Sequence, residues 1–387
     1  MMRWMSASTR MELLVAADDR TGALETAGMC AAAGAGAVLV TTELIDAGRT
    51  ATMVVDLGTR HLSGAAAGER AAAMEGLASE RAAHKIDSTL RGNWAAELVA
   101  RHRVSGRRVL VVPAFPLVGR TCVDGVVLEH GVPVANGSTA GDVRSAVRSS
   151  RPADHLRAAG AVEVDVLATL HDAQHWLDGS GAGFAVCDAT SWDDLVAVGR
   201  ATAGAGHVLL AGTAATIAAS VLATAEPSPC AVTLSAPVLV VCGSVHPMAR
   251  AQVDALMAAG VEWASVDGDG RLVVAALRRG QPGVLSTTMP AGAVAHHEAE
   301  GTADRLAAMG LAMVKDAGVQ TLIIIGGDTA AAVLGSHPVL VGGTVAAGMP
   351  WCRRVDDGGD GDGPLVVTRA GGFGTPTSLV ELLELLA

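Results

Sequence analysis

The sequence contains no tyrosine, and phenylalanine occurs only 3 times in 387 residues. The cores must therefore be built from alanine, valine and leucine, which suits helices packed closely on a sheet. Lysine is almost absent: Lys85 and Lys315 are the only two, so 26 of the 28 basic residues are arginines. A lysine within a polar cluster therefore indicates a need for a compact point charge.

Other absences argue against whole classes of protein. No apolar segment reaches about 18 residues and no charged-then-apolar leader opens the chain, so we expect neither a membrane span nor secretion. The 6 cysteines form no C-x-x-C pair, which favours free thiols in a reducing cytoplasm. A net charge of −11 argues against a general nucleic-acid-binding protein.

The length of 387 residues exceeds the roughly 250–300 residues at which single cores stop growing. Strand and helix patterns alternate through both halves, and a proline-bearing stretch at 224–237 separates them. We predict an α/β protein with domains at residues 11–225 and 237–387 and a linker at 226–236. Each domain is expected to be a mostly parallel sheet flanked by helices.

The densest polar cluster is the stretch 85–92, KIDSTLRG, which we place between helices at 71–81 and 93–101. A strand at 83–87 is expected to lead into it. The cluster offers the cation Lys85, the carboxylate Asp87, the hydroxyls of Ser88 and Thr89, and the guanidinium of Arg91. The alternative is that a hydroxyl caps the next helix beside a solvated ion pair.

Further charged residues follow predicted strands at 12–16, 52–56 and 109–112, namely Asp18 and Asp19, Arg60, and Arg120. Because the carboxyl ends of parallel strands share one edge of a sheet, we expect these side chains to converge. Paired carboxylates can accept hydrogen bonds from sugar hydroxyls, hold a cation or take a proton. One aspartate capping a helix while the other is solvated is the alternative.

Residues 81–120 carry eight basic and two acidic side chains, which suits a small anionic ligand. Four of these arginines are expected to form a solvated basic face instead, namely Arg101, Arg103, Arg107 and Arg108.

The second half contains glycine-bearing loops between strands and helices, which can bring backbone N–H groups close to phosphates. These loops are Gly243-Ser244, Gly326-Gly327-Asp328-Thr329 and the stretch 371–375. None matches a P-loop or a dinucleotide fingerprint, so plain tight turns are the alternative. Asp328 is a candidate for Mg²⁺ or for a helix cap. The stretch 356–363, DDGGDGDG, is read as an acidic surface loop.

Taken in order, the motifs resemble those of the four-carbon acid sugar kinase family. The resemblance spans almost the whole chain and rests on ADDRTGA at 17–23, KIDSTLRG at 85–92, PAFP at 113–116 with GRT at 119–121, GS at 243–244, GGDT at 326–329 and GFG at 372–374. It implies a sugar-acid-binding first domain, a nucleotide-binding second domain and an active site in the cleft between them. It also implies transfer of the ATP γ-phosphoryl to a hydroxyl, typically the terminal one, of threonate, erythronate or an oxo-tetronate.

The resemblance and the needs of phosphoryl transfer together suggest roles for individual residues. Asp19, Lys85 and Asp87 are the expected catalytic residues, with Asp19 favoured over Asp87 as the base. The expected substrate contacts are Asp18, Arg60, Ser88, Thr89, Arg91 and Arg120. Nucleotide contacts fall on Ser244, Gly326, Gly327, Asp328, Thr329, Gly372 and Gly374, with Asp328 also meeting Mg²⁺.

Departures from the family pattern leave the substrate and nucleotide preferences open, among them Asp328, where glutamate is common, and Gly212-Thr213, where a glycine-serine turn is expected. Gly372 stands where the family often has asparagine, and Arg369 stands where lysine is usual. The rival functions are a sugar-acid sensor without catalysis, a nicotinamide-dependent sugar-acid dehydrogenase, and a phosphatase or isomerase of phosphorylated sugar acids. The sequence does not fix the oligomeric state, and a homodimer is the assembly to be tested.

Overall fold

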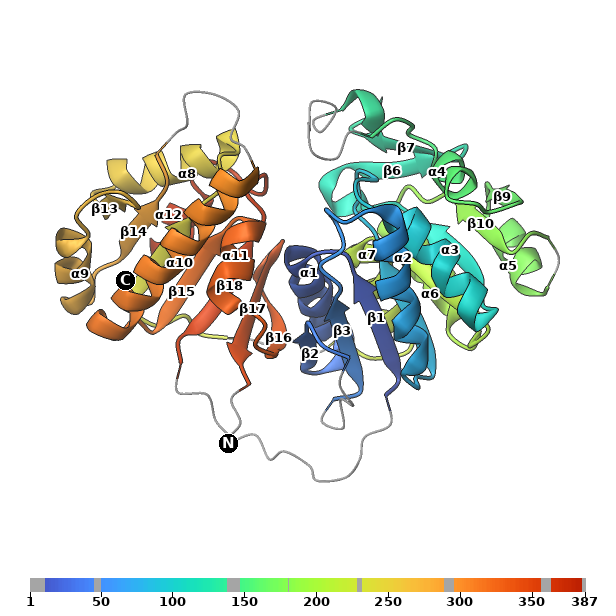
Figure 1. Cartoon of the computed structure of the whole chain (residues 1–387), viewed down its shortest axis with the longest axis horizontal. Coiled ribbons are helices and arrows are strands. Elements are labelled where there is room, and N and C mark those ends of the chain that lie inside the picture. The colour runs from blue at the N-terminus through green and yellow to red at the C-terminus, as the bar shows by residue number, and fades with distance from the viewer. Residues whose placement is uncertain are drawn as a thin grey trace. The chain divides into compact units, whose positions relative to one another are not determined.

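The computed structural model describes residues 11–44, 50–137, 147–179, 181–227, 232–288, 296–355 and 363–384, without the side chains of residues 296–300. The chain divides into two compact units, Met1–Pro229 and Cys230–Ala387 (Figure 1). Almost all of the predicted acidic loop at 356–363 lies outside the described residues. No helix in the described part is long and apolar enough to cross a membrane.

The first unit contains a parallel sheet with the strand order β2-β3-β1-β4-β11-β5-β10-β9. Most of its strands are buried along their whole length, as expected of a parallel sheet covered on both faces. Their bounds are β1 Leu13–Ala17, β2 Val38–Thr41, β3 Thr52–Asp56, β4 Arg81–Lys85, β5 Arg108–Val112, β9 Val164–Leu167, β10 Phe184–Cys187 and β11 Val208–Gly212.

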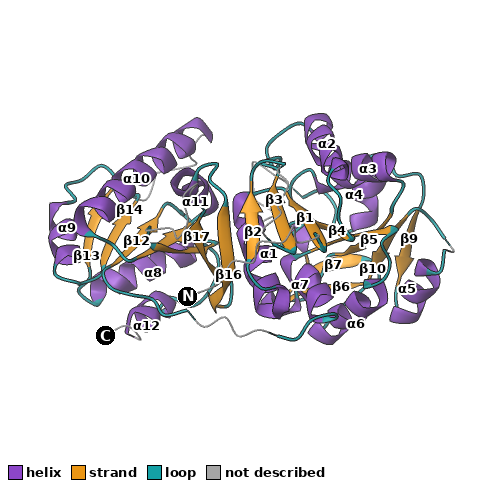
Figure 2. Ribbon diagram, turned by 90° about the horizontal axis from the view of Figure 1, so that it is seen from below, coloured by secondary structure: helices purple, strands orange, loops and turns teal. Residues whose placement is uncertain are grey.

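Helices cover both faces of this sheet, with α2, α3 and α4 on one side and α1, α6 and α7 on the other (Figure 2). Their bounds are α1 Arg20–Cys30, α2 Gly64–Ala72, α3 Trp94–Ser105, α4 Pro152–Ala158, α5 Leu170–Leu177, α6 Trp192–Thr202 and α7 Ala214–Leu222. A small antiparallel sheet, which we did not predict, is formed by β6 Arg120–Val123, β7 Val126–Glu129 and β8 Val132–Pro133.

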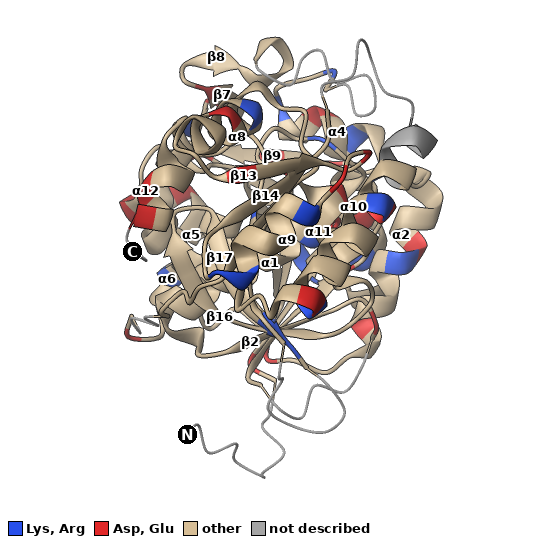
Figure 3. Cartoon of the chain, turned by 90° about the vertical axis from the view of Figure 1, so that its left-hand side faces the viewer, with Lys and Arg blue, Asp and Glu red and all other residues tan. Residues whose placement is uncertain are grey.

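The second unit has the strand order β13-β14-β12-β15-β18-β17-β16, in which only β17 runs antiparallel to its neighbours. Its strands are β12 Val238–Cys242, β13 Glu262–Ser265, β14 Gly283–Ser286, β15 Thr321–Ile325, β16 Val339–Ala346, β17 Met349–Arg354 and β18 Leu365–Arg369. Its helices are α8 Pro247–Ala258, α9 Arg271–Arg278, α10 His296–Ala317, α11 Gly327–Leu334 and α12 Ser378–Glu384. Figure 3 shows both signs of charge along α10 and acidic positions on α12. The predicted α/β class is confirmed in both units.

Two local predictions were wrong. The helix expected at 71–81 ends earlier, because α2 stops at Ala72, a 3-10 turn ends at Gly76 and β4 already begins at Arg81. Arg101 is fully buried instead of solvated. Its Nε lies 2.6 Å from Glu75 Oε1 and its Nη1 donates to the carbonyl of Ala83 at 2.8 Å. A buried carboxylate and a strand carbonyl therefore replace water around this guanidinium.

Candidate functional site

The candidate site of the first unit lies at the carboxyl ends of three neighbouring strands. The strands β3, β1 and β4 are adjacent, and Ala17 at the end of β1 is in register with both Asp56 and Lys85. The chain therefore leaves all three strands at one edge of the sheet, as expected for a parallel arrangement. Asp18 and Asp19 follow β1, Arg60 follows β3, and Lys85 is the last residue of β4.

Arg60 is the cation at the centre of this edge. Its Nε and Nη2 atoms donate to the two oxygens of Asp18 at 2.8 and 2.9 Å. Its Nη1 lies 2.7 Å from Asp19 Oδ2, and its Nη2 lies 3.8 Å from Asp87 Oδ1. One guanidinium thus holds carboxylates from two separate loops.

Both aspartates that follow β1 are engaged. Asp19 is the N-cap of α1, where its side chain accepts a hydrogen bond from the Gly22 amide at 2.9 Å, so the capping alternative is correct for this residue. Arg60 and Lys85 together hold the pKa of Asp19 below its usual value despite burial. Asp18 is fully buried, and this burial raises its pKa although the Arg60 fork opposes the rise.

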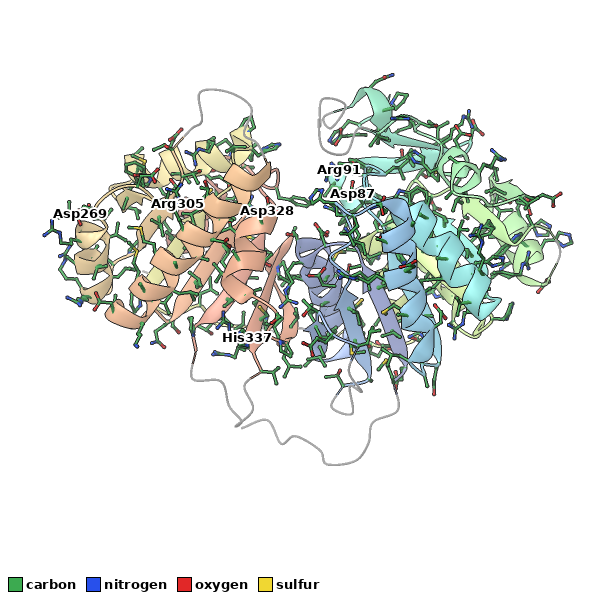
Figure 4. All side chains as sticks on the ribbon, viewed as in Figure 1. Asp87, Arg91, Asp269, Arg305, Asp328 and His337 are labelled. Carbon is green, nitrogen blue, oxygen red and sulfur yellow. The ribbon has the colours of Figure 1, made fainter. Side chains whose placement is uncertain are left out.

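The 85–92 loop folds around Asp87. The carboxylate accepts from the Thr89 amide at 3.1 Å, the Thr89 hydroxyl at 2.5 Å, and Nε and Nη2 of Arg91, both at 3.0 Å (Figure 4). These partners, chiefly Arg91 and Arg60, hold the pKa of Asp87 well below its usual range. Neither hydroxyl of the loop caps α3, whose N-cap is Asn93.

Gly92 closes this loop in a conformation that favours glycine, with φ of 88°. A Cβ atom there would lie only 2.8 Å from Oδ2 of Asp18, so the backbone must pass close to this carboxylate. The glycine at the end of the motif is thereby explained by a close approach between two loops.

Lys85 lies with its ammonium group against the first turn of α1. Its side chain is only 6% exposed, and a Cβ atom at Gly22 would lie 2.4 Å from Nζ. Among the described residues, the carboxylate within ion-pair distance of Nζ is that of Asp19, at 3.9 Å. The cation is thus enclosed without a close counter-ion, which leaves its three donors for another partner.

Arg120, at the start of β6, joins the small sheet to the 85–92 loop. Its Nη1 donates to Ser88 Oγ at 2.7 Å, and its Nη2 lies 2.7 Å from Glu129 Oε1 on β7. Side-chain contacts therefore join seven of the predicted residues of this unit into one cluster: Asp18, Asp19, Arg60, Lys85, Asp87, Thr89 and Arg91. The Arg120–Ser88 pair lies beside this cluster, because Ser88 follows Asp87 in the chain.

Two further carboxylates, which the sequence reasoning missed, lie in or beside this cluster. Asp56 is the last residue of β3, and burial raises its pKa to about 6. Glu25, on α1, is partly exposed, and burial raises its pKa against the opposing charges of Lys85 and Arg120. The spacing of Glu25 three residues after Gly22 was the available signal, since it places both on one helix face.

In the second unit, glycine loops converge at the ends of β12, β15 and β18, which are adjacent strands. A Cβ at Gly371 would lie 1.9 Å from Ser244 Oγ, and one at Gly243 would lie 2.1 Å from Thr329 Oγ1. Gly326, with φ of 116°, precedes α11 and lies near the Ser244 amide. The loops therefore pack so closely that side chains at the glycine positions are excluded.

Two helices begin at this edge, α8 after His246 and α11 after Gly326. The α11 N-terminus has no side-chain cap, so its amides and helix dipole favour an anion such as a phosphate. At α8 the first residue is a proline and the Met248 amide already donates to the His246 side chain, so this helix contributes mainly its dipole. The loop at 370–375 is held from α8, because Gln252 Nε2 donates to the carbonyls of Phe373 and Thr375 at 3.0 and 2.8 Å. Arg369 also donates to the Phe373 carbonyl, and a Cβ at Gly374 would collide with the Arg369 guanidinium.

Asp328 and Thr329 lie in the first turn of α11, where Asp328 is labelled in Figure 4. In the described part of the chain, no group of three or more His, Cys, Asp or Glu residues could hold a metal ion. A single carboxylate at a helix N-terminus suited to phosphate fits Mg²⁺, which is usually bound through one or two carboxylates together with phosphates and water. The residues present are therefore compatible with magnesium carried by a nucleotide.

We expect Gly371→Ala to raise the dissociation constant of a nucleotide by about tenfold or more, because the new methyl group would displace Ser244 and separate two loops. Gly301→Ala is the control, since nothing lies within 4 Å of a Cβ there. Titration of a fluorescent ATP analogue measures both variants. Equal affinity in the two would contradict a ligand site at these loops.

Comparison with known proteins supports the same division of the chain. Residues 13–221 match the family model "Sugar-binding N-terminal domain", and residues 239–379 match "Nucleotide-binding C-terminal domain". A D-threonate kinase from Salmonella typhimurium is 29% identical over 428 aligned positions, covering 96% of this chain and 98% of that protein. A D-threonate kinase from Bordetella bronchiseptica is 29% identical, covering 79% of this chain and 78% of that protein.

A D-erythronate kinase from Heliobacterium modesticaldum is 39% identical over 23% of this chain and 21% of that protein. Among solved structures, a Salmonella typhimurium protein superimposes with a TM-score of 0.79 at 19% identity, covering 97% of this chain and 100% of that one. A Haemophilus influenzae protein superimposes with a TM-score of 0.71 at 21% identity, covering 94% and 97%. These structural likenesses establish the shared fold.

Proposed function

The chain belongs to the four-carbon acid sugar kinase family, and we propose that it is an ATP-dependent kinase acting on a hydroxyl, expected to be the terminal one, of a four-carbon sugar acid. The observation that carries the proposal is the connected cluster of cations and carboxylates at the ends of β1, β3 and β4. D-threonate is the first substrate to test, followed by erythronate and a 3-oxo-tetronate.

The cluster has the groups that such a substrate needs. Arg91 and Arg120 are cations that can fork a carboxylate, although each now holds a protein carboxylate. The carboxylates of Asp18, Asp19 and Asp87 can accept hydrogen bonds from hydroxyl groups. Lys85, enclosed and without a close counter-ion, is suited to the charge of the transferring phosphoryl or of the sugar acid.

ATP is proposed to bind at the loops of the second unit. The amides at the start of α11 and the loop at 370–375 would hold its phosphates. Mg²⁺, held through Asp328 and the phosphates, supplies neutralisation of the phosphate charge when it is bound. The nucleotide and the sugar acid are thus assigned to different units, and phosphoryl transfer requires the γ-phosphoryl group to come within reach of the attacking hydroxyl.

We further propose that the protein works in the cytoplasm, where the buried cysteines Cys30, Cys122, Cys187, Cys242 and Cys352 would stay reduced. A homodimer stays a prediction, which size-exclusion chromatography with light scattering can test.

The experiment is coupled ADP release from the protein with ATP and Mg²⁺, using each of the three sugar acids in turn. We expect ADP release that depends on one acid, with a phosphorylated acid found by mass spectrometry. Thermal stabilisation of the protein by a sugar acid without ADP release would favour a sensor. Reduction of a nicotinamide cofactor would favour a dehydrogenase. Turnover of a phosphorylated sugar acid without nucleotide would favour a phosphatase or an isomerase. Folded protein that is inactive with every four-carbon acid would overturn the proposal.

A further inference from the structure

The attacking hydroxyl must lose its proton during phosphoryl transfer, and a carboxylate near the cluster is the natural acceptor. The carboxylates predicted from the sequence are already occupied by donors. Asp18 is fully buried behind Arg60, Asp19 caps α1 and faces Arg60, and Asp87 accepts from Thr89 and Arg91. Hydrogen bonds and cations that stabilise the charged form make a carboxylate a weaker base.

Glu129 does not supply the missing acceptor either, because it is paired with Arg120 at 2.7 Å. Asp56 accepts from the Gly58 amide at 3.0 Å and is buried at the end of β3. Glu129 is therefore committed to Arg120, and Asp56 is less accessible to a substrate than a partly exposed carboxylate.

Glu25 differs from these carboxylates in its contacts. It is partly exposed, and within the part of the chain that the structure describes its side chain makes no hydrogen bond or ion pair. It follows Gly22 by three residues on α1, so the two lie one above the other on the same helix face. The Lys85 ammonium rests against that face, 2.4 Å from the position of a Gly22 Cβ.

We propose that Glu25 is the catalytic base, taking the proton of the sugar acid's attacking hydroxyl beside the ammonium of Lys85. This assignment rests on the proposed kinase function and replaces the expectation that Asp19 plays this part. Asp19 then acts as a positioning residue, through the start of α1 and through Arg60.

The step balances without any further reactant. A lone pair of the hydroxyl oxygen forms a bond to the γ-phosphorus of ATP, and the bond from that phosphorus to the β–γ bridging oxygen breaks. Its electron pair leaves with ADP. The hydroxyl proton passes to a carboxylate oxygen of Glu25 and then to solvent, which returns the residue to its charged form.

The environment of Glu25 suits a proton acceptor. Burial raises its pKa, the carboxylates of Asp19 and Asp87 raise it further, and the cations Lys85 and Arg120 lower it. These groups come from the start of α1, the end of β4 with its following loop, and β6. A base with a raised pKa retains more affinity for a proton than the donor-saturated Asp87, whose pKa lies well below the usual range.

The test compares Glu25→Gln with the wild type in steady-state ADP release, using the sugar acid that the wild type phosphorylates. We expect kcat to fall by about 10²–10⁴-fold. The KM for the acid should stay within about threefold, because the amide keeps the size and hydrogen-bonding capacity of the side chain. In the wild type kcat should rise with pH through the pKa of the base, and this rise should disappear in the variant.

Glu69→Gln is the matched control, because Glu69 is an exposed glutamate on α2. It should leave kcat and its pH profile unchanged. Glu25→Asp should keep part of the activity and the acidic limb, since it retains a carboxylate that is one methylene shorter. Melting temperatures check that each variant is folded.

The outcomes separate the two proposals. An active wild type with Glu25→Gln within fivefold of its kcat, or with an unchanged pH profile, overturns the role of Glu25 and leaves the kinase function standing. A folded wild type without ADP release for any sugar acid overturns the kinase function, and the role of Glu25 with it.

Discussion

Replacing Lys85 with methionine is expected to lower kcat by about 10³-fold, the upper range for loss of one preorganised electrostatic donor. Methionine keeps the length and the apolar stem of the side chain but removes its charge. The Lys85 side chain is 6% exposed. Its ammonium group is enclosed by the first turn of α1, and Asp19 Oδ1 lies 3.9 Å from Nζ. A positive charge held in this way is available to the charge that develops on the transferring phosphoryl group.

Lys315→Met is the matched control, because Lys315 is the only other lysine and lies exposed on α10. Its kcat should equal that of the wild type. Lys85→Arg should not rescue the activity, because the guanidinium group is larger than the ammonium group. Nζ of Lys85 already lies only 2.4 Å from the position that a Cβ atom at Gly22 would take, so there is no room for it. Steady-state ADP release measures all three variants, and a Lys85→Met enzyme within tenfold of the wild type would remove Lys85 from the mechanism.

The positions of Lys85 and the other predicted residues follow from a rule that can be applied to the sequence alone. Apolar runs such as the one in β15 mark buried parallel strands, and their carboxyl ends must lie on one edge of the sheet. Polar residues placed just after such runs therefore meet in space, as Asp18, Arg60 and Lys85 do.

Other features depend on contacts that are distant in the chain and could not be predicted in this way. Burial of Arg101 requires Glu75 on the preceding 3-10 turn and the carbonyl of Ala83, neither of which leaves a pattern around Arg101. The short strands β6 and β7 contain only four residues each, too few for a periodicity to be recognised. Glu25 was missed because a glutamate within a helix is ordinarily a surface residue.

The same contacts predict a large loss of stability when Arg60 is replaced by methionine. The side chain of Arg60 is 15% exposed and holds Asp18 and Asp19 directly, with Asp87 3.8 Å away. Its removal leaves buried carboxylates close together with too little positive charge. We expect the free energy of unfolding at pH 7.5 to fall by about 3–5 kcal/mol, as for other broken buried ion pairs.

The loss of unfolding free energy in Arg60→Met should depend on pH, and the carboxylates decide whether it grows or shrinks as the pH rises. Without Arg60 the pKa values of Asp18 and Asp19 in the folded protein rise, because the cation that lowered them is gone. The folded variant then binds more protons than the folded wild type, so its deficit grows as pH rises and shrinks as pH falls through the raised values. Urea denaturation of both proteins at pH 5 and pH 7.5 measures the difference.

Arg157→Met provides the reference for an ordinary surface ion pair in the same unit. Arg157 lies 3.6 Å from Asp154, and the two side chains are 51% and 48% exposed, so its loss should cost less than about 1 kcal/mol at either pH. A deficit for Arg60→Met no larger than this, or one that is equal at both pH values, would mean that Arg60 does not hold the carboxylates in the folded state. The arrangement that we assign to sugar-acid binding would then lack its central cation.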